Sequence, residues 1–239
     1  MEAIVLAGGL GTRLRSVITE VPKPMAPVAG RPFLDYILYY LKKEGVTRVV
    51  LAVGYKWEVI RDYYADANSA FGLELDYSVE VEPLGTGGAI FKAAEKVKGD
   101  NFFIINGDTS FPIPLKRLSS FAGKTTAELA IALKKISNSD RYGSVEHSAD
   151  GHIISFKEKG QNCGATAEIN GGIYFMQKAL INRFTFPEKF SFETDFMQSK
   201  LGSMNAFAKT FNSTFIDIGI PEDYYRAQKL FKNVINEEI

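Results

Sequence analysis

The amino-acid sequence predicts an α/β fold in which a mixed, mostly parallel sheet carries helices on both faces. Through the first hundred residues, apolar residues recur by turns at strand spacing and at helical spacing, and this alternation is typical of doubly wound sheets. The run 102–106 is strongly apolar, as expected of a central strand buried on both faces. No proline-, glycine- or serine-rich linker interrupts the 239 residues, so we expect a single domain over 1–239.

The expected elements follow one another in a regular order. A buried strand ends near Ala7, and Pro32 begins a helix that stops before Gly45. Further elements of the first half are strands at 46–53, 73–79 and 102–106 and helices at 57–64 and 89–97. From residue 127 onward we expect strands at 127–134, 143–147, 153–156 and 169–175, a helix at 193–201, a strand at 214–218 and a last helix from Pro221. This second half should extend the sheet and build a pocket.

Composition excludes several classes of function. Lysine plus arginine and aspartate plus glutamate balance at 28 each, which argues against a duplex nucleic-acid binder because that task needs a basic excess. No apolar run approaches the length of a membrane helix and no charged leader precedes the first strand, so we expect a soluble, cytoplasmic protein without a membrane partner. The single cysteine, Cys163, allows no internal disulfide and suits a reducing compartment.

The first strand runs into a glycine-rich loop, Gly-Gly-Leu-Gly-Thr-Arg-Leu at 8–14, and Lys23 follows between two prolines. Backbone N–H groups without side chains around them can approach a polyphosphate closely. A P-loop would end in Gly-Lys-Ser/Thr, and the dinucleotide fingerprint needs a third glycine where Leu14 stands. The loop therefore indicates a nucleotide-binding turn of another kind and speaks against a nicotinamide oxidoreductase.

Two further stretches lie where α/β sheets bind ligands. Glu80 opens a second glycine-rich loop, Glu-Val-Glu-Pro-Leu-Gly-Thr-Gly-Gly-Ala, which leads into the expected helix at 89–97. Gly107 and Asp108 directly follow the central strand at its carboxyl end. In open α/β sheets ligands bind at that end of the strands.

Together with the first loop and Lys23, these stretches resemble the signature of the sugar-1-phosphate nucleotidyltransferases, which join a nucleoside triphosphate to a sugar 1-phosphate and release pyrophosphate. The likeness covers nearly the whole chain in the family's order. It implies a Rossmann-like, GT-A-like domain with a nucleotide-binding half at about 1–110 and a sugar-phosphate-binding half at about 111–239. It also implies a nucleoside triphosphate and a sugar 1-phosphate as partners, and it leaves a homodimer open.

The resemblance implies the following site residues. The implied nucleotide site consists of Leu6, Ala7, Gly8, Gly9, Gly11, Thr12, Arg13, Glu80, Pro83, Gly85, Thr86 and Gly107. The implied catalytic residues are Arg13, Lys23 and Asp108, and Asp108 and Asp217 are the implied ligands of Mg²⁺. The implied sugar-phosphate site consists of Glu158, Lys159, Asn170 and Gly171. The family writes Asn-Ala-Gly where this chain has Asn-Gly-Gly, and Gly171 is expected to widen the site slightly.

The expected reaction needs no general base. A sugar 1-phosphate has a second pKa of about 6, so it arrives mostly as a dianion and is already a nucleophile. Catalysis should rest on charge neutralisation and in-line positioning, with Mg²⁺ as a clamp. Arg13 should neutralise the leaving pyrophosphate, Lys23 should bridge the reacting phosphates, and Lys159 should hold the acceptor phosphate. Glu193, in contrast, is expected to be only a first-turn acid of its helix.

The choice of nucleotide depends on Glu80, which the family's loop places at the base edge. A carboxylate only accepts hydrogen bonds, and guanine offers adjacent N1–H and N2–H₂ donors, which uracil and cytosine lack. This favours GTP. Within the family the motifs look most like guanylyltransferases of D-glycero-α-D-manno-heptose 1-phosphate in bacterial surface-polysaccharide synthesis. A uridylyl-, thymidylyl- or cytidylyltransferase on another phosphate, and a catalytically inactive nucleotide-sugar sensor, remain as alternatives.

Overall fold

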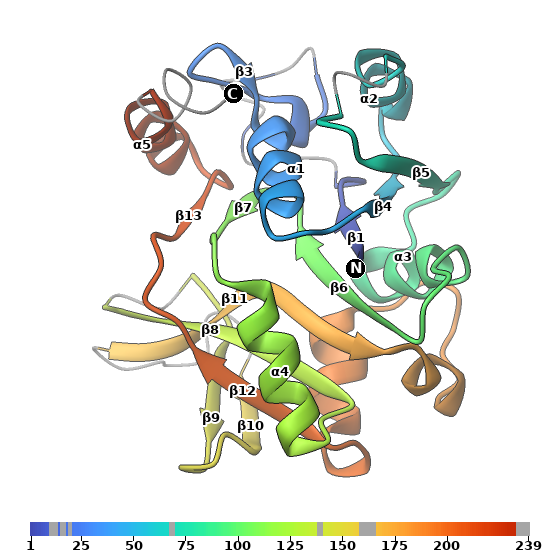
Figure 1. Ribbon diagram of the computed structural model, residues 1–239, viewed down its shortest axis with the longest axis vertical. Coiled ribbons are helices and arrows are strands. Elements are labelled where there is room, and N and C mark those ends of the chain that lie inside the picture. Colours follow the sequence, from blue (N-terminus) through green and yellow to red (C-terminus); the bar gives the residue numbers. More distant parts are fainter. Residues whose placement is uncertain are drawn as a thin grey trace.

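The computed structural model describes residues 1–9, 14, 18, 21–66, 70–137, 141–157 and 166–232. Within these ranges one nine-stranded sheet runs through both halves of the chain, in the order β10-β9-β11-β6-β1-β4-β5, with β8 beside β11 and β12 beside β8 (Figure 1). The strands are β1 (Glu2–Leu6), β4 (Arg48–Val53), β5 (Glu74–Val79), β6 (Asn101–Asn106), β8 (Leu129–Ser137), β9 (Ser144–His147), β10 (Ile153–Lys157), β11 (Thr166–Gln177) and β12 (Ala206–Thr210).

The sheet is mixed, as predicted, and its two halves differ in strand direction. In the first half β1 pairs in parallel with β4 and β6, and β4 pairs in parallel with β5. In the second half β11 runs antiparallel to β6, β8 and β9, β9 runs antiparallel to β10, and β12 lies parallel to β8. Leu6 lies beside Ala52 and Asn106, so β1, β4 and β6 end along one edge and the loops that follow them meet there.

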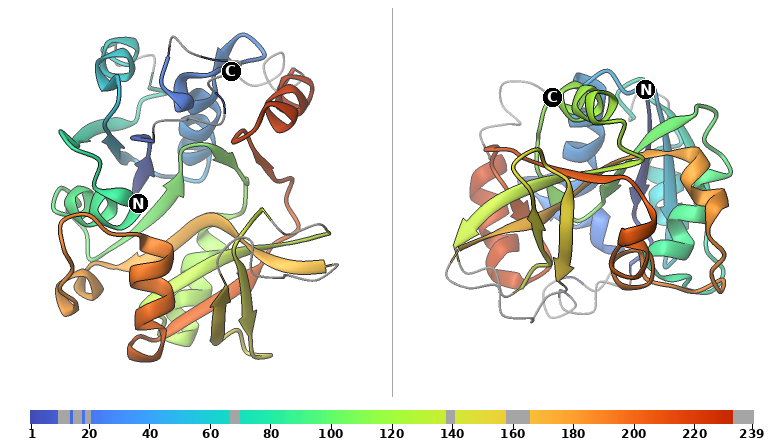
Figure 2. Two further views of the ribbon diagram at one scale, coloured as in Figure 1. Left: turned by 180° about the vertical axis from the view of Figure 1, so that it is seen from behind. Right: turned by 90° about the horizontal axis from the view of Figure 1, so that it is seen from below.

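Helices cover both faces of the sheet, as the sequence predicts. They are α1 (Phe33–Lys43), α2 (Trp57–Tyr63), α3 (Gly85–Ala94), α4 (Leu115–Thr125), α5 (Pro221–Phe231), the π-helix η4 (Phe192–Gln198) and the 3₁₀ turns η2 (Lys23–Met25), η3 (Lys178–Arg183) and η5 (Leu201–Ser203). Side chains alternate along a strand, so Val5 joins the core under α1 and α4 while Ile4 joins the core under α3 and η4. Figure 2 shows α3 and η4 on the face opposite to α1 and α4.

The beginning of α3 corrects one prediction. The helix begins at Gly85 and not at Ala89, so three of the loop's glycines lie in its first turn. A Cβ atom at Gly87 would stand 2.2 Å from the Phe190 ring, and one at Gly88 would stand 2.3 Å from the Glu188 carbonyl oxygen. These two glycines are therefore required by close packing between α3 and the segment before η4, a contact between elements that local sequence patterns do not show.

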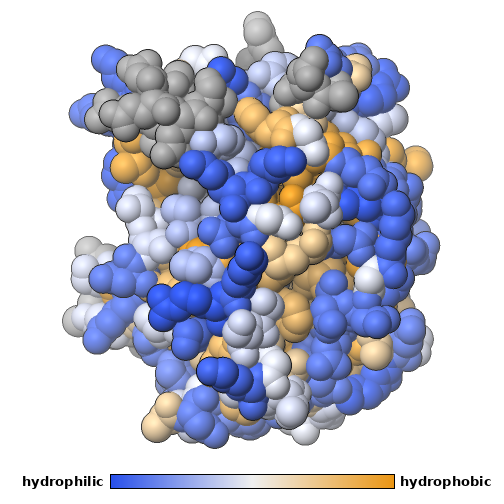
Figure 3. Space-filling view, viewed as in Figure 1, coloured by the Kyte–Doolittle hydropathy of each residue, from blue (hydrophilic) through white to orange (hydrophobic). Residues whose placement is uncertain are grey.

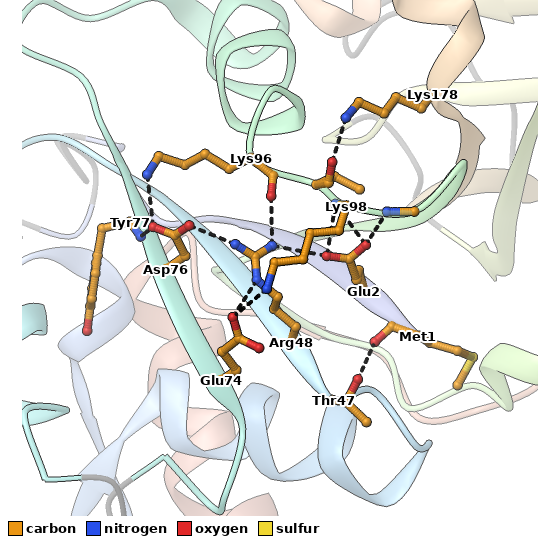
Figure 4. Close-up of polar contacts among 12 residues, drawn as sticks. Met1, Glu2, Thr47, Arg48, Glu74, Asp76, Tyr77, Lys96, Lys98 and Lys178 are labelled. Atoms are coloured by element: carbon orange, nitrogen blue, oxygen red, sulfur yellow. Dashed lines mark hydrogen bonds and ion pairs between the residues drawn. The ribbon is translucent and has the colours of Figure 1, made fainter.

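At the amino ends of the strands, Arg48 is buried in a network of charges (Figure 4). Its guanidinium donates to Glu74 at 2.9 Å, Glu2 at 3.0 Å, Asp76 at 2.7 Å and the Lys96 carbonyl oxygen at 2.8 Å. Lys96 and Lys98 add ion pairs to Asp76 and Glu74, each at 2.9 Å. The network joins β1, β4, β5 and the segment after α3, so it holds the parallel strands together at the end away from the predicted site.

Two short strand pairs and α5 complete the fold. Thr109–Ser110 (β7) runs antiparallel to Ile216–Asp217 (β13), and Pro27–Val28 (β2) runs antiparallel to Arg31–Pro32 (β3). Helix α5 packs on β2, where the Tyr224 hydroxyl donates to the Pro27 carbonyl oxygen at 2.5 Å. The last helix is thus tied to the segment that follows Lys23.

None of the helices in the described ranges is long and apolar enough to cross a bilayer. On the face shown in Figure 3, a band of hydrophilic residues crosses the middle, and apolar residues are visible mainly to the right of it. The expected cytoplasmic location remains a prediction from the sequence.

Candidate active site

The segment that carries Lys23 is shaped by its two prolines. Pro22 and Pro24 flank Lys23, and the turn η2 closes when the Met25 N–H donates to the Pro22 carbonyl oxygen at 2.8 Å. Pro24 and Met25 are buried, which anchors the turn in the core. From this turn the Lys23 side chain extends toward the carboxyl end of β6, where its Nζ contacts Asp108.

Asp108 and Asp217 meet through the small sheet of β7 and β13. Asp108 directly precedes β7, and the register of the pair places Asp217 opposite Thr109. The Ile218 N–H also donates to the Asp108 carbonyl oxygen at 3.0 Å. The structure therefore brings together two aspartates that the sequence connects only by resemblance.

Lys23 lies between these two carboxylates. Its Nζ is 2.5 Å from Asp108 Oδ2 and 3.8 Å from Asp217 Oδ1. The lysine side chain is only 10% exposed, whereas those of Asp108 and Asp217 are 38% and 22% exposed. One ammonium thus faces two carboxylates in a partly enclosed place, and the three charges do not balance.

The pKa values of the two aspartates diverge because of this imbalance. Burial acts to raise the pKa of Asp108, but the charge and hydrogen bond of Lys23 outweigh it and hold that pKa below the ordinary value. Burial, followed by repulsion from Asp108, raises the pKa of Asp217 to about 6. Two neighbouring carboxyls with opposite shifts are typical of a functional site, and a further cation would relieve the repulsion between them.

The donor set fits a hard divalent cation. Among the described residues no group of three or more His, Cys, Asp and Glu side chains is placed to hold a metal ion. Mg²⁺, however, is usually bound by one or two carboxylates together with substrate phosphates and water. Asp108 and Asp217 are suited to that mode, and Lys23 Nζ lies where positive charge is needed between them.

A cavity of about 290 Å³ opens beside Lys23 and Asp108. It is bounded by both glycine-rich segments and by the carboxyl ends of β1 and β6. The described residues around it include Leu6, Gly8, Gly9, Lys23, Pro24, Glu80, Pro83, Gly85, Thr86, Ala89, Asn106, Gly107, Asp108 and Glu193. Most of the nucleotide-site residues implied by the resemblance thus line one cavity, whereas Ala7 is buried and contributes a backbone hydrogen bond to Ala52.

Glu80 stands at the wall of this cavity with its carboxylate oriented by the backbone. Its Oε2 accepts from the Leu84 N–H at 2.9 Å. Burial raises the pKa of Glu80, while the Leu84 hydrogen bond and the charge of Lys92 act against the rise. A half-buried, oriented carboxylate is an acceptor whose direction is set before a ligand arrives.

A second cavity, of about 460 Å³, adjoins the first and shares Thr86, Asn106, Asp108 and Glu193 with it. Its other lining residues are Thr109, Arg141, Tyr142, Gly143, Phe156, Asn170, Gly172, Ser191, Thr194, Phe215 and Asp217. Asn170 is held by Tyr174, to whose hydroxyl its amide donates at 2.5 Å, and its Oδ1 accepts from the Gly172 N–H at 3.0 Å.

The expectation that Gly171 widens the sugar-phosphate site is wrong. A Cβ atom there would stand 2.6 Å from the Phe111 ring and 2.8 Å from the Ala132 carbonyl oxygen, so this position faces the core. Gly172 lines the cavity in its place. Because neighbouring strand residues point to opposite faces, only one of the two glycines could reach the cavity.

Glu193 is a site residue that the sequence interpretation missed. It lines both cavities, and its Oε2 accepts from the Thr86 hydroxyl at 2.6 Å. The same hydroxyl oxygen accepts from the Phe192 N–H at 2.9 Å. Thr86 thereby joins the nucleotide loop to η4. A first-turn acid has an ordinary local explanation, so no sequence signal separated it from solvent-facing acids.

Several expected site residues lie outside the described residues. They are Gly11, Thr12 and Arg13 of the first loop and Glu158 and Lys159 of the sugar-phosphate motif. Cys163 also lies there.

The chain belongs to the family described as nucleotidyl transferase, whose sequence pattern matches residues 2–233. A relative from Aneurinibacillus thermoaerophilus, named D-glycero-alpha-D-manno-heptose 1-phosphate guanylyltransferase, is 46% identical over 98% of this chain and 100% of its own length. A protein of the same name from Campylobacter jejuni is 47% identical over 94% of this chain and 97% of its own.

Solved structures agree with the fold. HddC from Yersinia pseudotuberculosis has a TM-score of 0.86 and 39% identity, covering 97% of this chain and 99% of its own. HddC has also been solved in complex with GMP-PN, and that structure has a TM-score of 0.84. The predicted fold class and the expected family are both confirmed.

Proposed function

We propose that this protein transfers the guanylyl group of GTP to D-glycero-α-D-manno-heptose 1-phosphate, giving GDP-heptose and pyrophosphate. The observation that carries the proposal is the convergence of Lys23, Asp108 and Asp217 where two adjoining cavities meet. One cavity is bounded by the glycine-rich segments and the other by Asn170 and η4, so each substrate has its own side of the reacting centre.

The chemistry is a displacement at the α-phosphorus. An oxygen of the sugar phosphate forms the new bond to phosphorus while the bond to the bridging oxygen of the pyrophosphate breaks, and the electron pair leaves with pyrophosphate. The acceptor is mostly a dianion at neutral pH, so no proton has to be removed. The protein must bring together two anionic groups, which makes cationic side chains and positioning the main contributions.

Lys23 would neutralise the reacting phosphates, and the position of its Nζ beside both carboxylates at the junction of the cavities supports this role. Asp108 and Asp217 would hold Mg²⁺, which supplies charge neutralisation at the phosphates when bound. The family resemblance implies that Arg13 would neutralise the pyrophosphate and that Lys159 would hold the acceptor phosphate. Glu193 and Asn170 carry acceptors and donors for sugar hydroxyls on the other side.

The preference for GTP rests on Glu80 and on the relatives. The carboxylate lines the nucleotide cavity and is oriented by Leu84, and guanine offers it two adjacent donors. Two relatives that match nearly the full chain are named as heptose 1-phosphate guanylyltransferases, and the HddC complex contains GMP-PN, a guanine nucleotide derivative by its name. The heptose is supported by these relatives alone.

The test is a pyrophosphate-release assay over a grid of GTP, UTP, dTTP, CTP and ATP against several sugar 1-phosphates. The proposal expects the highest kcat/KM for GTP with the heptose 1-phosphate, and loss of turnover with a chelator of divalent cations. A clear preference for another triphosphate would replace the guanylyl assignment. Binding of nucleotide without turnover for any pair would instead support a catalytically inactive nucleotide-sugar sensor.

A further inference from the structure

The cavity of about 460 Å³ that Asn170 lines, called the acceptor cavity from here on, has few positive charges in its described lining for binding a phosphate. Three of the charged side chains that line it are acids, namely Asp108, Glu193 and Asp217. Arg141 is the only cationic side chain among the described residues of its lining. Of the four charged side chains in this described lining, three would therefore repel a sugar phosphate dianion and one guanidinium would attract it.

Arg141 is held in place from two sides. Its NH2 lies 2.9 Å from Asp223 Oδ2, a carboxylate of α5 whose side chain is only 10% exposed. The guanidinium also lies over the Tyr142 ring, 5.5 Å from the centroid. Tyr142 in turn packs edge-on against Phe215, with centroids 5.4 Å apart, and Phe215 directly precedes the strand of Asp217. The guanidinium is thus fixed relative to the reacting centre.

Pairing with Asp223 does not by itself account for this arginine. Arg226 already pairs with the same carboxylate from within α5, at 3.4 Å. The Arg141 side chain, in contrast, keeps 42% of its surface exposed while it lines the cavity. A guanidinium carries five N–H groups in a planar fork that matches phosphate oxygens two at a time, so contact with Asp223 leaves donors for a ligand.

We propose that Arg141 binds the phosphate of the acceptor substrate and that Asp223 is the residue that positions it. The inference rests on the proposed function and adds a phosphate-binding residue beside Lys159. It concerns the acceptor and not the triphosphate, because Arg141 lines the cavity of Asn170 and does not line that of Glu80. Its positive charge also reaches Asp217, where it acts against the rise of that pKa.

The experiment measures KM for each substrate separately, with the other at saturation. Arg141→Ala should raise KM for the sugar 1-phosphate by about 10- to 100-fold, as expected for lost charged hydrogen bonds, and should leave KM for GTP within about 2-fold. Arg141→Lys should recover part of the loss, because it restores the charge but not the fork. Asp223→Asn should raise the same KM by about 3- to 10-fold, since the guanidinium stays but loses its anchor.

Arg226→Ala is the matched control, because Arg226 also pairs with Asp223 but does not line the cavity. Both KM values of this variant should equal those of the wild type. Added guanidinium ion should partly restore Arg141→Ala, which a purely structural defect would not allow. An unchanged acceptor KM in Arg141→Ala, or an equal rise of both KM values, overturns the proposal. If Arg141→Ala does not fold, Arg141→Lys decides by the same criterion.

The wild-type enzyme is assayed first, so a failure of the proposed function is seen separately as the absence of turnover for every pair. In that case calorimetry with inorganic phosphate compares wild type with Arg141→Ala. Weaker binding by the variant supports the assignment of Arg141 as a phosphate ligand, and equal binding overturns it.

Discussion

The two ends of the central strands carry two charge clusters that differ in their balance of cations and acids. At the amino ends, Arg48, Lys96 and Lys98 face Glu2, Glu74 and Asp76, so three cations match three acids. At the carboxyl ends, Lys23 forms ion pairs with both Asp108 and Asp217, so among these three side chains one cation faces two acids. Both clusters are partly shielded from water by the same sheet, and the difference between them is their balance of charge.

The pKa values report this difference. Hydrogen bonds from Lys98 and Arg48 lower the pKa of Glu74, and for Glu2 and Asp76 similar contacts outweigh the effect of burial, so their pKa values are lowered too. At the other end, burial and repulsion raise the pKa of Asp217 to about 6. Removing one partner from the balanced network would leave charges uncompensated, whereas the unbalanced cluster is suited to a further cation.

The largest expected effect comes from breaking the unbalanced cluster. Asp108→Asn should lower kcat by about 1,000-fold, because it removes one of two candidate metal ligands and the carboxylate that orients Lys23. Thermal stability should fall little, since the amide keeps the size and removes a repulsion with Asp217. Steady-state kinetics and thermal melting of the same preparation measure both. Turnover near that of wild type would exclude Asp108 from the catalytic machinery.

Substitution of the two lysines assigned to phosphates should affect different kinetic constants. Lys23→Ala should lower kcat by about 100-fold, because the proposed function assigns Lys23, the partner of Asp108, to the reacting phosphates. Lys159→Ala should mainly raise KM for the sugar 1-phosphate. Kinetics with each substrate varied in turn distinguish the two effects. Equal loss of triphosphate binding in both variants contradicts these roles.

A substitution in the balanced cluster should change the stability of the protein and not its catalytic rate. Arg48→Met should lower the free energy of unfolding by about 2–4 kcal/mol, because removing one partner of a buried ion pair leaves the other charges uncompensated. The surrounding carboxylates are partly exposed, so the loss stays below that of a fully enclosed pair. The kcat of the remaining folded enzyme should be unchanged. Chemical denaturation at pH 7 measures the loss.

Acid should remove the advantage of the wild type over Arg48→Met. The lowered pKa values of Glu2, Glu74 and Asp76 give stability that is present above their ordinary values and is lost as pH falls through the lower folded-state values. The difference between the two proteins should therefore shrink as the pH falls below about 4. Lys98→Met, at an exposed member of the same network, is the control and should cost less than about 1 kcal/mol. A difference that is independent of pH would contradict the ionic origin.

The smallest expected effect concerns nucleotide choice. Glu80→Gln should lower the ratio of kcat/KM for GTP to that for UTP by about 10- to 100-fold, because one acceptor becomes a donor facing the donors of guanine. Glu82→Gln, an exposed change in the same loop, is the control and should leave the ratio unchanged. If Glu80→Gln also leaves it unchanged, Glu80 does not recognise the base.

The raised pKa of Glu80 adds a pH test to this prediction. As pH falls toward that pKa, the carboxyl gains a proton and becomes a donor, so the preference of the wild type for GTP should weaken at acid pH. This loss begins at a higher pH than it would for an ordinary glutamate. The Glu80→Gln ratio should not depend on pH in the same range.

What the sequence determined by itself was local. The apolar run of β6 followed by Gly107 and Asp108 predicted a ligand-binding strand end. An apolar run indicates a strand buried on both faces, and the two residues that follow it in the chain lie at its carboxyl end. Lys23 between two prolines was also recognisable from neighbouring residues alone. The order of strands and helices in the first half followed from hydrophobic periodicity, which depends on residues only a few positions apart.

What only the tertiary structure decided depends on contacts between distant segments. The register of β7 against β13 sets Asp217 beside Asp108, packing against Phe190 explains Gly87, and the fold brings Glu193 and Arg141 to the acceptor cavity. A glutamate in a first helical turn and an arginine in a loop look ordinary in the chain. Long-range packing places both beside the same cavity, and no local pattern encodes that choice of neighbours.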